Sequence, residues 1–368
     1  MTITSLMIGI EYPSDHAPVD ETYAAEKRAL VEGKTVLVTG GTGSIGREIA
    51  KQAHQHGAHV VRVYSRNEFN QYRMQQEFER FGNMRYLLGD IRDRDRLSRA
   101  CEGVNVVFHA AALKHVPACE YNPFEAVKTN AVGTQNVIEA AMEFDVERFI
   151  AVSTDKAVSP SNTMGATKLL AERLVLAANM YKGGRRCAFS VVRFGNVLAS
   201  RGSVIPHFIR QIRDGGPVTL THKKMRRFFM SIPEAANLVL TAAALSSGSE
   251  VFILKMPVIL ISDLIDVLVE IYAPRFNREP SEIAVSITGL RAGEKVQEEL
   301  MTAEERHASK ETDRFFVIPA HFTPPIRNGG PELLGYNTLS QGALPKDELK
   351  RIICGNGLVE ELAKLAEE

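Results

Sequence analysis

The sequence predicts an α/β protein built on a doubly wound parallel sheet, with a smaller second α/β domain. Short β-rich segments alternate with amphipathic helical segments from residue 34 onward, and the β-rich segments are apolar along almost their whole length. A glycine-rich stretch, VTGGTGSIG, directly follows the first of them. Strands that are apolar on both faces belong in a sheet that helices cover on both sides, which is the usual place of parallel strands.

The first half of the chain shows this alternation most clearly. Its strands are bounded by Gly, Asp or Ser, and its helices carry apolar residues at helical spacing. One short helix is also expected within residues 21–31, before the first strand. The predicted strands cover residues 34–39, 59–65, 84–90, 104–110, 148–154 and 187–195, and the predicted helices cover residues 44–56, 68–81, 94–102, 122–144 and 163–181.

The alternation becomes less regular after Asn196. Helices are still predicted at residues 203–214, 233–245 and 261–273, with short strands at 218–221 and 251–255. We therefore expect a smaller domain that closes one end of the sheet. The expected division is an N-terminal extension (1–32), a large domain (33–195, joined by 232–255), the smaller domain (196–231 and 256–330) and a C-terminal tail with a helix (331–368).

The composition argues against several functional classes. The 368 residues include 44 Lys and Arg and 44 Asp and Glu, so the net charge gives no sign of a nucleic-acid or anionic-membrane partner. No apolar run approaches the roughly 18 residues of a membrane span, and the N-terminus is unlike a secretory signal. The four cysteines lack Cys-x-x-Cys spacing, which favours free thiols. We expect a cytoplasmic globular protein.

The glycine-rich stretch has the spacing of a dinucleotide-binding turn. Gly41, Gly43 and Gly46 fit Gly-x-Gly-x-x-Gly, and Gly40, Gly43 and Gly46 fit Gly-x-x-Gly-x-x-Gly. Glycine permits a sharp turn and lets the backbone approach a pyrophosphate, which the N–H groups of the next helix then bind. Such a stretch can be only a turn, but its place between a strand and a helix indicates a nucleotide site. The large domain is therefore expected to be a Rossmann domain.

The end of the second predicted strand, RVYSRNEF, bears on which dinucleotide binds. An acidic residue there suits NAD, whereas this chain has Ser65 and Arg66. A small polar residue followed by a cation favours the 2′-phosphate of NADP over NAD, unless Arg66 is only a solvated surface charge. Asp90, after the third strand, suits the adenine edge but equally suits a helix cap. Cofactor contacts are expected at Gly40, Gly43, Ser44, Ile45, Gly46, Ser65, Arg66, Asp90, Ile91, Ala110, Ala111 and Lys168.

The segment AVSTDKAVSPSNTMGATKLL contains the residues expected to do the chemistry. Met164 and Lys168 are four residues apart on a helix and share one face. In the short-chain dehydrogenase/reductase superfamily this spacing is Tyr-x-x-x-Lys, and methionine cannot transfer a proton as tyrosine does. Thr154, Asp155 and Lys156 end the fifth strand, at the sheet edge where such folds bind ligands. An acid beside an amine suggests elimination, with a surface ion pair as the plain alternative.

The chain resembles the UDP-N-acetylglucosamine 4,6-dehydratases of the extended short-chain dehydrogenase/reductases, which supply sugars for capsule, O-antigen and flagellin. The resemblance spans roughly residues 33–300 and continues more weakly beyond. Members of the family carry either tyrosine or methionine at the position of Met164. The motifs are VTGGTGSIG, GDIRDRDRL, VFHAAALKHVPACEYNPFEAVKTNAVGTQNV, VSTDKAVSPSNTMGATK, VRFGNVLASRGSVIPHF and RAGEK.

The resemblance implies a redox-neutral cycle that yields a 4-keto-6-deoxy sugar. Hydride leaves carbon 4 for NADP+ and returns to carbon 6, while Lys156 removes the carbon 5 hydrogen and Asp155 protonates the departing hydroxyl. Lys156 then needs a lowered pKa, which burial beside a cationic nicotinamide ring favours. Thr154 is expected to hydrogen-bond the carbon 4 hydroxyl, whose proton Lys156 could relay, and Lys168 to hold the cofactor ribose. Inversion at carbon 5 and the choice of UDP over GDP stay open.

The resemblance also implies the substrate contacts. The planar fork of an arginine suits a diphosphate, and Arg226 competes with its neighbour Arg227 for this role. The expected contacts are Lys114 near the sugar–phosphate path, Asn196, Arg227 and Arg291 at the diphosphate, and Glu294 at the uridine ribose.

Two other functions stay open at this point. A nucleotide-sugar 4-epimerase shares the fold and cofactor, but such enzymes generally rely on the tyrosine. A non-catalytic NADP-sensing protein would have no reason to keep Asp155, Lys156 and Lys168 together. We expect no metal site at His54, His56 and His59, because positions two apart on a helix point to different faces and no carboxylate or cysteine cluster accompanies these histidines. The family resemblance also implies a homo-oligomer, a dimer or larger.

Overall fold

A computed structural model of the chain describes residues 23–200, 202–319, 335–355 and 358–367. Residues 1–22 of the predicted N-terminal extension lie outside the described residues, as do residues 320–330 of the predicted smaller domain and 331–334 of the predicted tail. The predicted division into domains stays a prediction.

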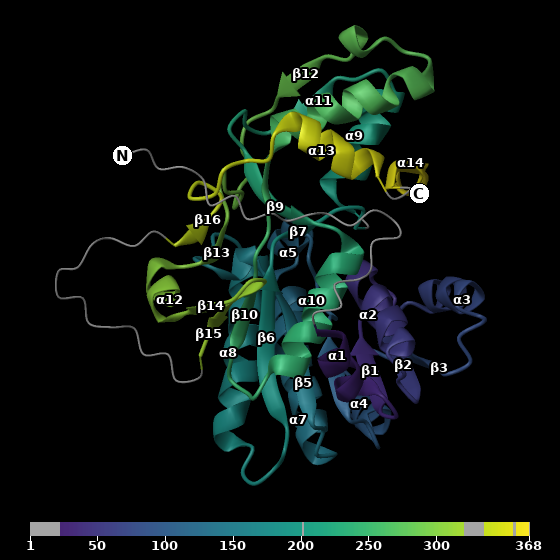
Figure 1. Cartoon of the computed structure of the whole chain (residues 1–368), viewed down its shortest axis with the longest axis vertical. Coiled ribbons are helices and arrows are strands. Elements are labelled where there is room, and N and C mark those ends of the chain that lie inside the picture. Colours follow the sequence, from purple (N-terminus) through teal and green to yellow (C-terminus); the bar gives the residue numbers. More distant parts are fainter. Residues whose placement is uncertain (1–22, 201, 320–334, 356–357, 368) are drawn as a thin grey trace, which may run out of the picture.

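One large sheet organises the described chain (Figure 1). All neighbouring strands from β10 to β3 pair parallel, whereas β15 pairs antiparallel with β10 and β14. This confirms the predicted doubly wound parallel sheet. In sheet order the strands are β14 (Lys310–Glu311), β15 (Phe315–Ile318), β10 (Val251–Leu254), β6 (Ala188–Phe194), β5 (Arg148–Thr154), β4 (Val106–His109), β1 (Thr35–Thr39), β2 (Val60–Ser65) and β3 (Met84–Leu88).

Helices pack against this sheet in two groups (Figure 1). One group contains α1, α2 and α10, and the other contains α4, α7 and α8. Because the strands are covered in this way, their apolar side chains on both faces are buried, as the sequence predicts. The helices of the large sheet are α1 (Ala24–Val31), α2 (Ser44–Gln55), α3 (Glu68–Glu77), α4 (Arg94–Cys101), α7 (Gly133–Glu143), α8 (Thr163–Tyr181) and α10 (Ile232–Leu245).

The long helix predicted at residues 122–144 is not uniformly α-helical. It begins as α6 (Pro123–Ala126), widens into a π-helical turn (Val127–Val132) and continues as α7. From the π-helical turn, Asn130 bonds the backbone N–H and carbonyl of Leu113 at 2.8 and 3.0 Å. A short helix that the sequence did not predict, α5 (Val116–Tyr121), precedes this run.

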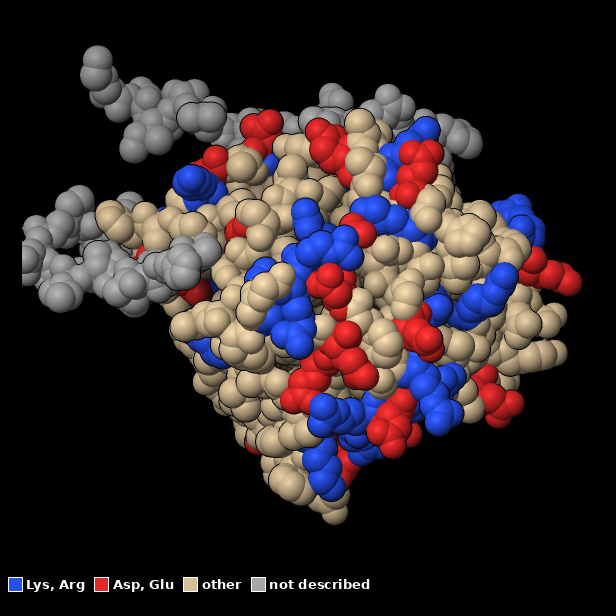
Figure 2. Space-filling model, turned by 90° about the horizontal axis from the view of Figure 1, so that it is seen from below, with Lys and Arg blue, Asp and Glu red and all other residues tan. Residues whose placement is uncertain are grey.

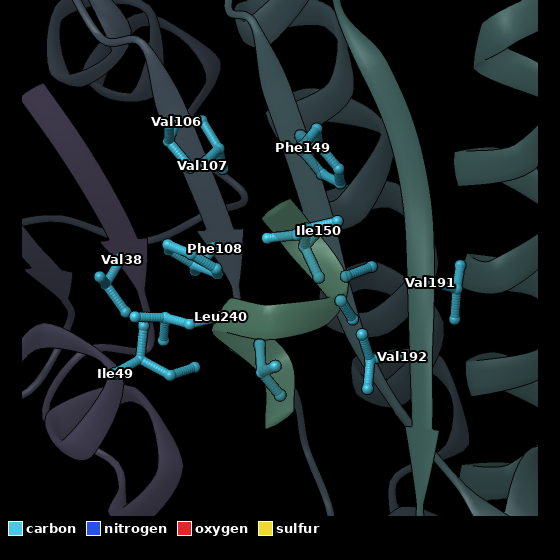
Figure 3. Packing of buried hydrophobic residues seen from close by; sticks show 14 of the residues in the cluster. Val38, Ile49, Val106, Val107, Phe108, Phe149, Ile150, Val191, Val192 and Leu240 are labelled. Atoms are coloured by element: carbon cyan, nitrogen blue, oxygen red, sulfur yellow. The ribbon is translucent and has the colours of Figure 1, made fainter. Parts of the chain in front are cut away.

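The main core lies between the sheet and its helices (Figure 3). Val38 of β1, Phe108 of β4 and Ile150 of β5 are fully buried and face Ile49 of α2 and Leu240 of α10. Burying large apolar side chains contributes roughly 1.5–3 kcal/mol each. The main core therefore fixes the positions of β1, β4 and β5, whose carboxyl ends carry the predicted functional residues.

A second apolar cluster lies above the sheet in the view of Figure 1. It joins four amphipathic helices that contact one another rather than the main sheet. Three small sheets connect the two parts: β11-β9-β7, β12-β8 and β13-β16. The elements are α9 (Val204–Arg213), α11 (Ile261–Tyr272), α12 (Ala303–Ala308), α13 (Lys346–Cys354), α14 (Leu358–Glu367), β7 (Asn196–Val197), β8 (Val218–Leu220), β9 (Arg226–Met230), β11 (Val258–Leu260), β12 (Val285–Ile287), β13 (Glu299–Met301) and β16 (Tyr336–Asn337).

The surface and the cysteines agree with the composition. On the face shown in Figure 2, cationic and anionic side chains lie next to one another. The four cysteines are free, which confirms the prediction from their spacing. Across the described ranges, every helix is too short or too polar to cross a membrane.

Candidate active site

The glycine-rich turn joins β1 to α2 in a close-packed form. Gly40 has a φ of 67°, and a Cβ there would lie 2.7 Å from the backbone nitrogen of Ala111. A side chain at Gly46 would strike the carbonyl oxygen of Gly40. Gly43 is the N-cap of α2 and has no side chain to cap the helix, so the positive end of the helix can receive an anion. These features fit the pyrophosphate of a dinucleotide.

The neighbouring strand ends bring further predicted cofactor residues to the same edge. Ser65 ends β2, is buried, and accepts a hydrogen bond from Gln71 at 3.1 Å. The side chain of Arg66 is 56% exposed and lies 3.9 Å from the Asp90 carboxylate. Exposed cationic charge at this position fits a phosphate on the adenosine ribose.

Asp90 is engaged by its own turn. It accepts hydrogen bonds from the backbone N–H and the guanidinium of Arg92. Burial opposes its ionisation, but the bonds from Arg92 hold the pKa of Asp90 below its ordinary value. The alternative that Asp90 caps a helix is wrong, because the N-cap of α4 is Asp93. Ile91 is buried beside Gly133 of α7.

Thr154, Asp155 and Lys156 form a tight hydrogen-bonded group where β5 ends. The Thr154 hydroxyl donates to Asp155 Oδ1 at 2.8 Å, and Lys156 Nζ donates to the same oxygen at 2.9 Å. Asp155 is completely buried. The predicted acid–amine pair is therefore a structured contact at the carboxyl end of a central strand, not a surface ion pair.

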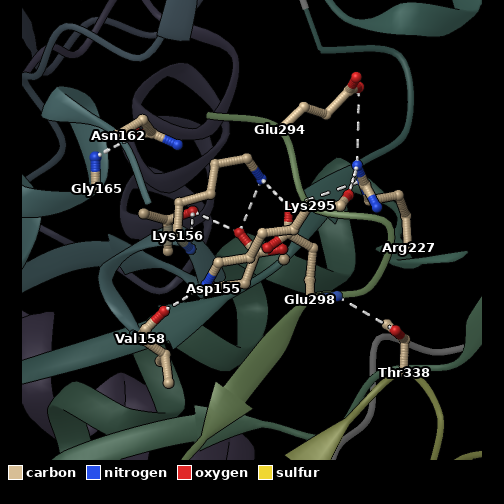
Figure 4. Close-up of polar contacts among 12 residues, drawn as sticks. Asp155, Lys156, Val158, Asn162, Gly165, Arg227, Glu294, Lys295, Glu298 and Thr338 are labelled. Carbon is tan, nitrogen blue, oxygen red and sulfur yellow. Dashed lines mark hydrogen bonds and ion pairs between the residues drawn. The ribbon is translucent and has the colours of Figure 1, made fainter. Parts of the chain in front are cut away.

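Glu298 is a third buried member of this group, and the sequence reading missed it (Figure 4). It immediately precedes β13 and is 3% exposed. Its Oε1 lies 3.6 Å from Lys156 Nζ and 3.8 Å from Arg227 Nε. The only sequence signal is its position three residues beyond RAGEK, which does not reveal that the side chain turns toward β5.

The charges around Lys156 overturn one expectation. Burial lowers the pKa of Lys156, but the carboxylates of Asp155 and Glu298 outweigh burial and raise it above its ordinary value. The expected lowering of this pKa is therefore wrong for the site formed by the protein residues alone. Lys156 rests as an ammonium ion there. Burial also raises the pKa of Glu298; Lys156 opposes this shift and Asp155 adds to it.

Met164 and Lys168 lie on the first turns of α8, and both are buried. Lys168 Nζ donates to the Val152 carbonyl of β5 at 2.7 Å. Burial lowers the pKa of Lys168 to about 8, against a smaller opposing effect of Glu172. Met164 packs with Cys119 and Ala126 in a small apolar cluster, so its thioether is part of the packing.

A cavity of about 430 Å³ opens beside this group. Among the predicted residues it is lined by Lys156, Asn196, Arg227, Arg291 and Glu294, which brings four predicted substrate residues together with the amine. Lys114, in contrast, is exposed on the loop after β4 and is not among the lining residues. The structure thus brings these four predicted residues together around one cavity, and a substrate contact of Lys114 stays a prediction.

Arg227 has a structural task as well. Its guanidinium donates to the carbonyls of Lys295 and Val296 at 2.8 and 3.2 Å, so it holds the RAGEK loop against β9. Arg226 instead reaches toward the Thr338 carbonyl at 3.4 Å and does not line the cavity. Of the two candidates, Arg227 is the one placed beside the cavity.

The buried oxygens of this region without a hydrogen-bond partner within the described residues include Asp155 Oδ2, Asn196 Oδ1, Ser203 Oγ and Glu298 Oε2. A buried polar atom without a partner costs roughly 1–3 kcal/mol. Such oxygens are found where a bound ligand or a transferred proton supplies the missing hydrogen-bond partner. The arrangement can therefore bind a polar molecule and exchange protons with it.

Comparisons with known proteins show which family the chain is similar to. A model of the family described as polysaccharide biosynthesis protein matches residues 36–320. The uncharacterized membrane protein MJ1061 of Methanocaldococcus jannaschii is 53% identical over 87% of this chain and 95% of its own. An inverting UDP-N-acetylglucosamine 4,6-dehydratase of Campylobacter jejuni is 41% identical over 78% of this chain and 84% of its own.

Two further similarities are to a named epimerase and to a solved structure. A UDP-glucose 4-epimerase of Rickettsia rickettsii is 39% identical over 78% of this chain and 83% of its own. The solved structure of Pen from Bacillus thuringiensis superposes with a TM-score of 0.82 at 44% identity, covering 88% of this chain and 98% of that one.

Proposed function

Because the chain belongs to the polysaccharide biosynthesis protein family, we propose that it is a nucleotide-sugar 4,6-dehydratase acting on UDP-N-acetylglucosamine or a closely related UDP- or GDP-N-acetylhexosamine. The observation that carries the proposal is the buried Asp155–Lys156 contact beside the cavity. An acid and an amine on adjacent residues suit the removal of water across two neighbouring carbons. The 41% identical relative named as such a dehydratase supports the choice of substrate.

The cofactor proposed for this site is NADP. When bound, it supplies hydride chemistry, taking hydride from carbon 4 of the sugar and giving it back to carbon 6. The close-packed turn at Gly40 and Gly46 would receive its pyrophosphate, and Arg66 its 2′-phosphate. Lys168, anchored on Val152, would donate to the nicotinamide ribose.

The residues around the sugar have separate tasks in this proposal. Lys156 removes the hydrogen of carbon 5, and Asp155 protonates the hydroxyl that leaves carbon 6. Thr154 orients Asp155 through its hydroxyl, which is a different task from the expected contact with the carbon 4 hydroxyl. Because Asp155 is completely buried and Lys156 Nζ holds its Oδ1, substrate binding must expose this carboxyl group before it can protonate the leaving hydroxyl.

The remaining parts of the proposal concern substrate binding and setting. Asn196, Arg227, Arg291 and Glu294 would contact the nucleotide, since all four line the cavity. Product inverted at carbon 5 is proposed from the relative named as inverting. We also propose a cytoplasmic homo-oligomer that makes sugars for surface polysaccharide or glycoprotein.

Incubation with UDP-N-acetylglucosamine in heavy water, followed by mass spectrometry, tests the proposal. The expected product is lighter by one water and carries deuterium at carbon 5. Its carbon 5 configuration, read by nuclear magnetic resonance, decides inversion. Asp155→Asn should abolish the product while leaving cofactor binding unchanged.

A 4-epimerase is the second candidate, because a 39% identical relative carries that name. Its chemistry needs only oxidation and reduction at carbon 4, so it gives the Asp155–Lys156 pair no task. Return of the 4-epimer without loss of water in the same experiment would establish it. Bound NADP with neither product, after GDP sugars have also been tried, would indicate a binding protein.

A further inference from the structure

The proposed dehydration leaves one proton without an acceptor. Oxidation at carbon 4 releases the hydroxyl proton, a step that the superfamily assigns to the tyrosine. Met164 cannot take it and is packed in an apolar cluster. Asp155 and Lys156 are already needed for the elimination. Because Lys156 rests as an ammonium ion, it must first give its own proton to a third group if it is to take the carbon 4 proton and the cycle is to close without exchange with water.

Glu298 has the placement that such a site needs. Its Oε1 is 3.6 Å from Lys156 Nζ, and its Oε2 is buried without a partner in the described chain. It lines the cavity together with Lys156. Its backbone is fixed separately, because Glu298 N–H donates to Thr338 Oγ1 at 3.3 Å and Thr338 N–H donates to the Glu298 carbonyl at 3.0 Å.

Other nearby groups are less suited to accept a proton from Lys156, because they are already hydrogen-bonded or lie farther away. The Thr154 hydroxyl is bonded to Asp155. His109 is bonded at both ring nitrogens, to Thr39 at 2.7 Å and to Thr134 at 2.9 Å. Glu294 lies on the far side of Arg227, at 3.9 Å from its guanidinium, and accepts from the Arg291 N–H. Glu298 is the carboxylate of these that directly approaches Lys156.

We propose that Glu298 stores one proton during each turnover, taking it from the Lys156 ammonium so that Lys156 can accept the carbon 4 hydroxyl proton, and returning it to Lys156 at the end of the cycle. This inference rests on the proposed dehydratase function. Glu298 acts through Lys156 and does not itself need to touch the sugar. It would thereby take over the proton-accepting part of the missing tyrosine.

The proton steps balance in order. The Lys156 ammonium passes a proton to the Glu298 carboxylate and takes the carbon 4 hydroxyl proton as hydride leaves that carbon. Lys156 next gives a proton to Asp155, which makes an amine and a carboxylic acid. The amine removes the carbon 5 proton, and the acid protonates the carbon 6 hydroxyl, which leaves as water.

The return steps restore the starting site. Hydride is added at carbon 6 and Lys156 gives a proton to carbon 5, so Lys156 is again an amine. The Glu298 acid then protonates Lys156. The sugar has lost one water, and Asp155, Lys156 and Glu298 have their initial charges.

The test compares Glu298→Gln, Glu298→Asp and the neighbouring Glu299→Gln as a matched control. Rapid mixing of NADP-loaded protein with UDP-N-acetylglucosamine follows the absorbance of reduced cofactor, which reports oxidation at carbon 4 alone. Glu298→Gln should slow this step about 100- to 1000-fold with KM changed less than threefold. Glu298→Asp should recover part of the rate, and Glu299→Gln should match the parent protein.

A pH profile separates proton storage from a purely structural role. In the parent protein the oxidation rate should rise as Glu298 ionises. In Glu298→Gln that limb should be replaced by one at higher pH, where Lys156 loses its proton to solvent. An unchanged oxidation rate, an effect on KM alone, or a slowed rate with the parent profile would overturn the proposal.

Infrared difference spectra across a pH titration of the protein without substrate give a second readout. A carboxyl band that titrates above the ordinary range and is missing in Glu298→Gln is expected. Its absence overturns the proposal whatever the substrate. If the band is present but the parent protein removes no water from any nucleotide sugar, the proposed function fails, and the assignment of the proton to carbon 4 fails with it.

Discussion

Arg193→Met should destabilise the folded protein strongly, because Arg193 is buried and fully bonded. It lies on β6, is 2% exposed, and bonds both carboxylate oxygens of Glu172 at 3.1 and 2.8 Å. It also bonds Glu305 at 2.9 and 3.2 Å and the Leu300 carbonyl at 3.0 Å. These contacts use all the N–H donors of a guanidinium. The network joins β6 to α8 and α12.

The magnitude follows from what the substitution leaves behind. The side chains of Glu172 and Glu305 are 3% and 16% exposed, so removing the cation leaves two carboxylates that water cannot solvate fully. Breaking a buried ion pair from one side costs about 3–5 kcal/mol. Methionine fills much of the space of the arginine stem, so the loss should come mainly from charge rather than from a cavity.

Urea unfolding followed by circular dichroism measures this loss, since the chain has no tryptophan to report by fluorescence. Adding Glu172→Gln to Arg193→Met should recover at least about 1 kcal/mol, because one stranded charge is removed. The control is Arg186→Met, which breaks an exposed ion pair with Asp145 and should leave the midpoint unchanged. A loss below about 1 kcal/mol, or no recovery in the double variant, would refute the reasoning.

Three further predictions concern the cofactor edge. Gly46→Ala should weaken NADP binding about tenfold or more by calorimetry, because the new methyl meets the Gly40 carbonyl, whereas Gly82→Ala points into open space and should bind as the parent does. Lys168 has a folded pKa of about 8 against an ordinary value of 10.5, so the unfolded chain binds more protons between these values and the free energy of unfolding should rise with pH there. Lys168→Met should lack that rise in urea titrations, and an identical slope would contradict the lowered pKa of Lys168. Arg66→Glu should reduce the affinity for NADP relative to NAD at least about tenfold in paired binding measurements, and an unchanged ratio would mean that Arg66 is only a surface charge.

The parallel core of the fold could be predicted from the sequence, and its edge could not. β5 and α8 have the predicted bounds because their apolar patterns are strong and Asn162 caps α8. β14 and β15 were missed because they are short; β15 pairs antiparallel with β10, which precedes it by about sixty residues, and β14 pairs only with β15. Local pattern identifies an element more readily than its distant partner.

The same limit applies to the site. The glycine turn and the Asp155–Lys156 contact are local, so their residues are contiguous in the sequence and could be found. Glu298 follows Lys156 by more than 140 positions in the sequence. It reaches Lys156 only because β13 packs against the end of β5 in the fold. The pKa of Lys156 was predicted in the wrong direction for this reason, since its second carboxylate was not visible.

The π-helical turn between α6 and α7 changes the direction in which side chains after the turn point, relative to those before it. One extra residue in a turn rotates everything downstream by about 100°. Glu125 before the turn can therefore meet Arg92 at 2.8 Å, while Thr134 after it meets His109 at 2.9 Å. Deleting a single residue within Val127–Val132 would preserve a good helix yet swing one of these contacts away, so natural variation in this helix should favour substitutions over length changes.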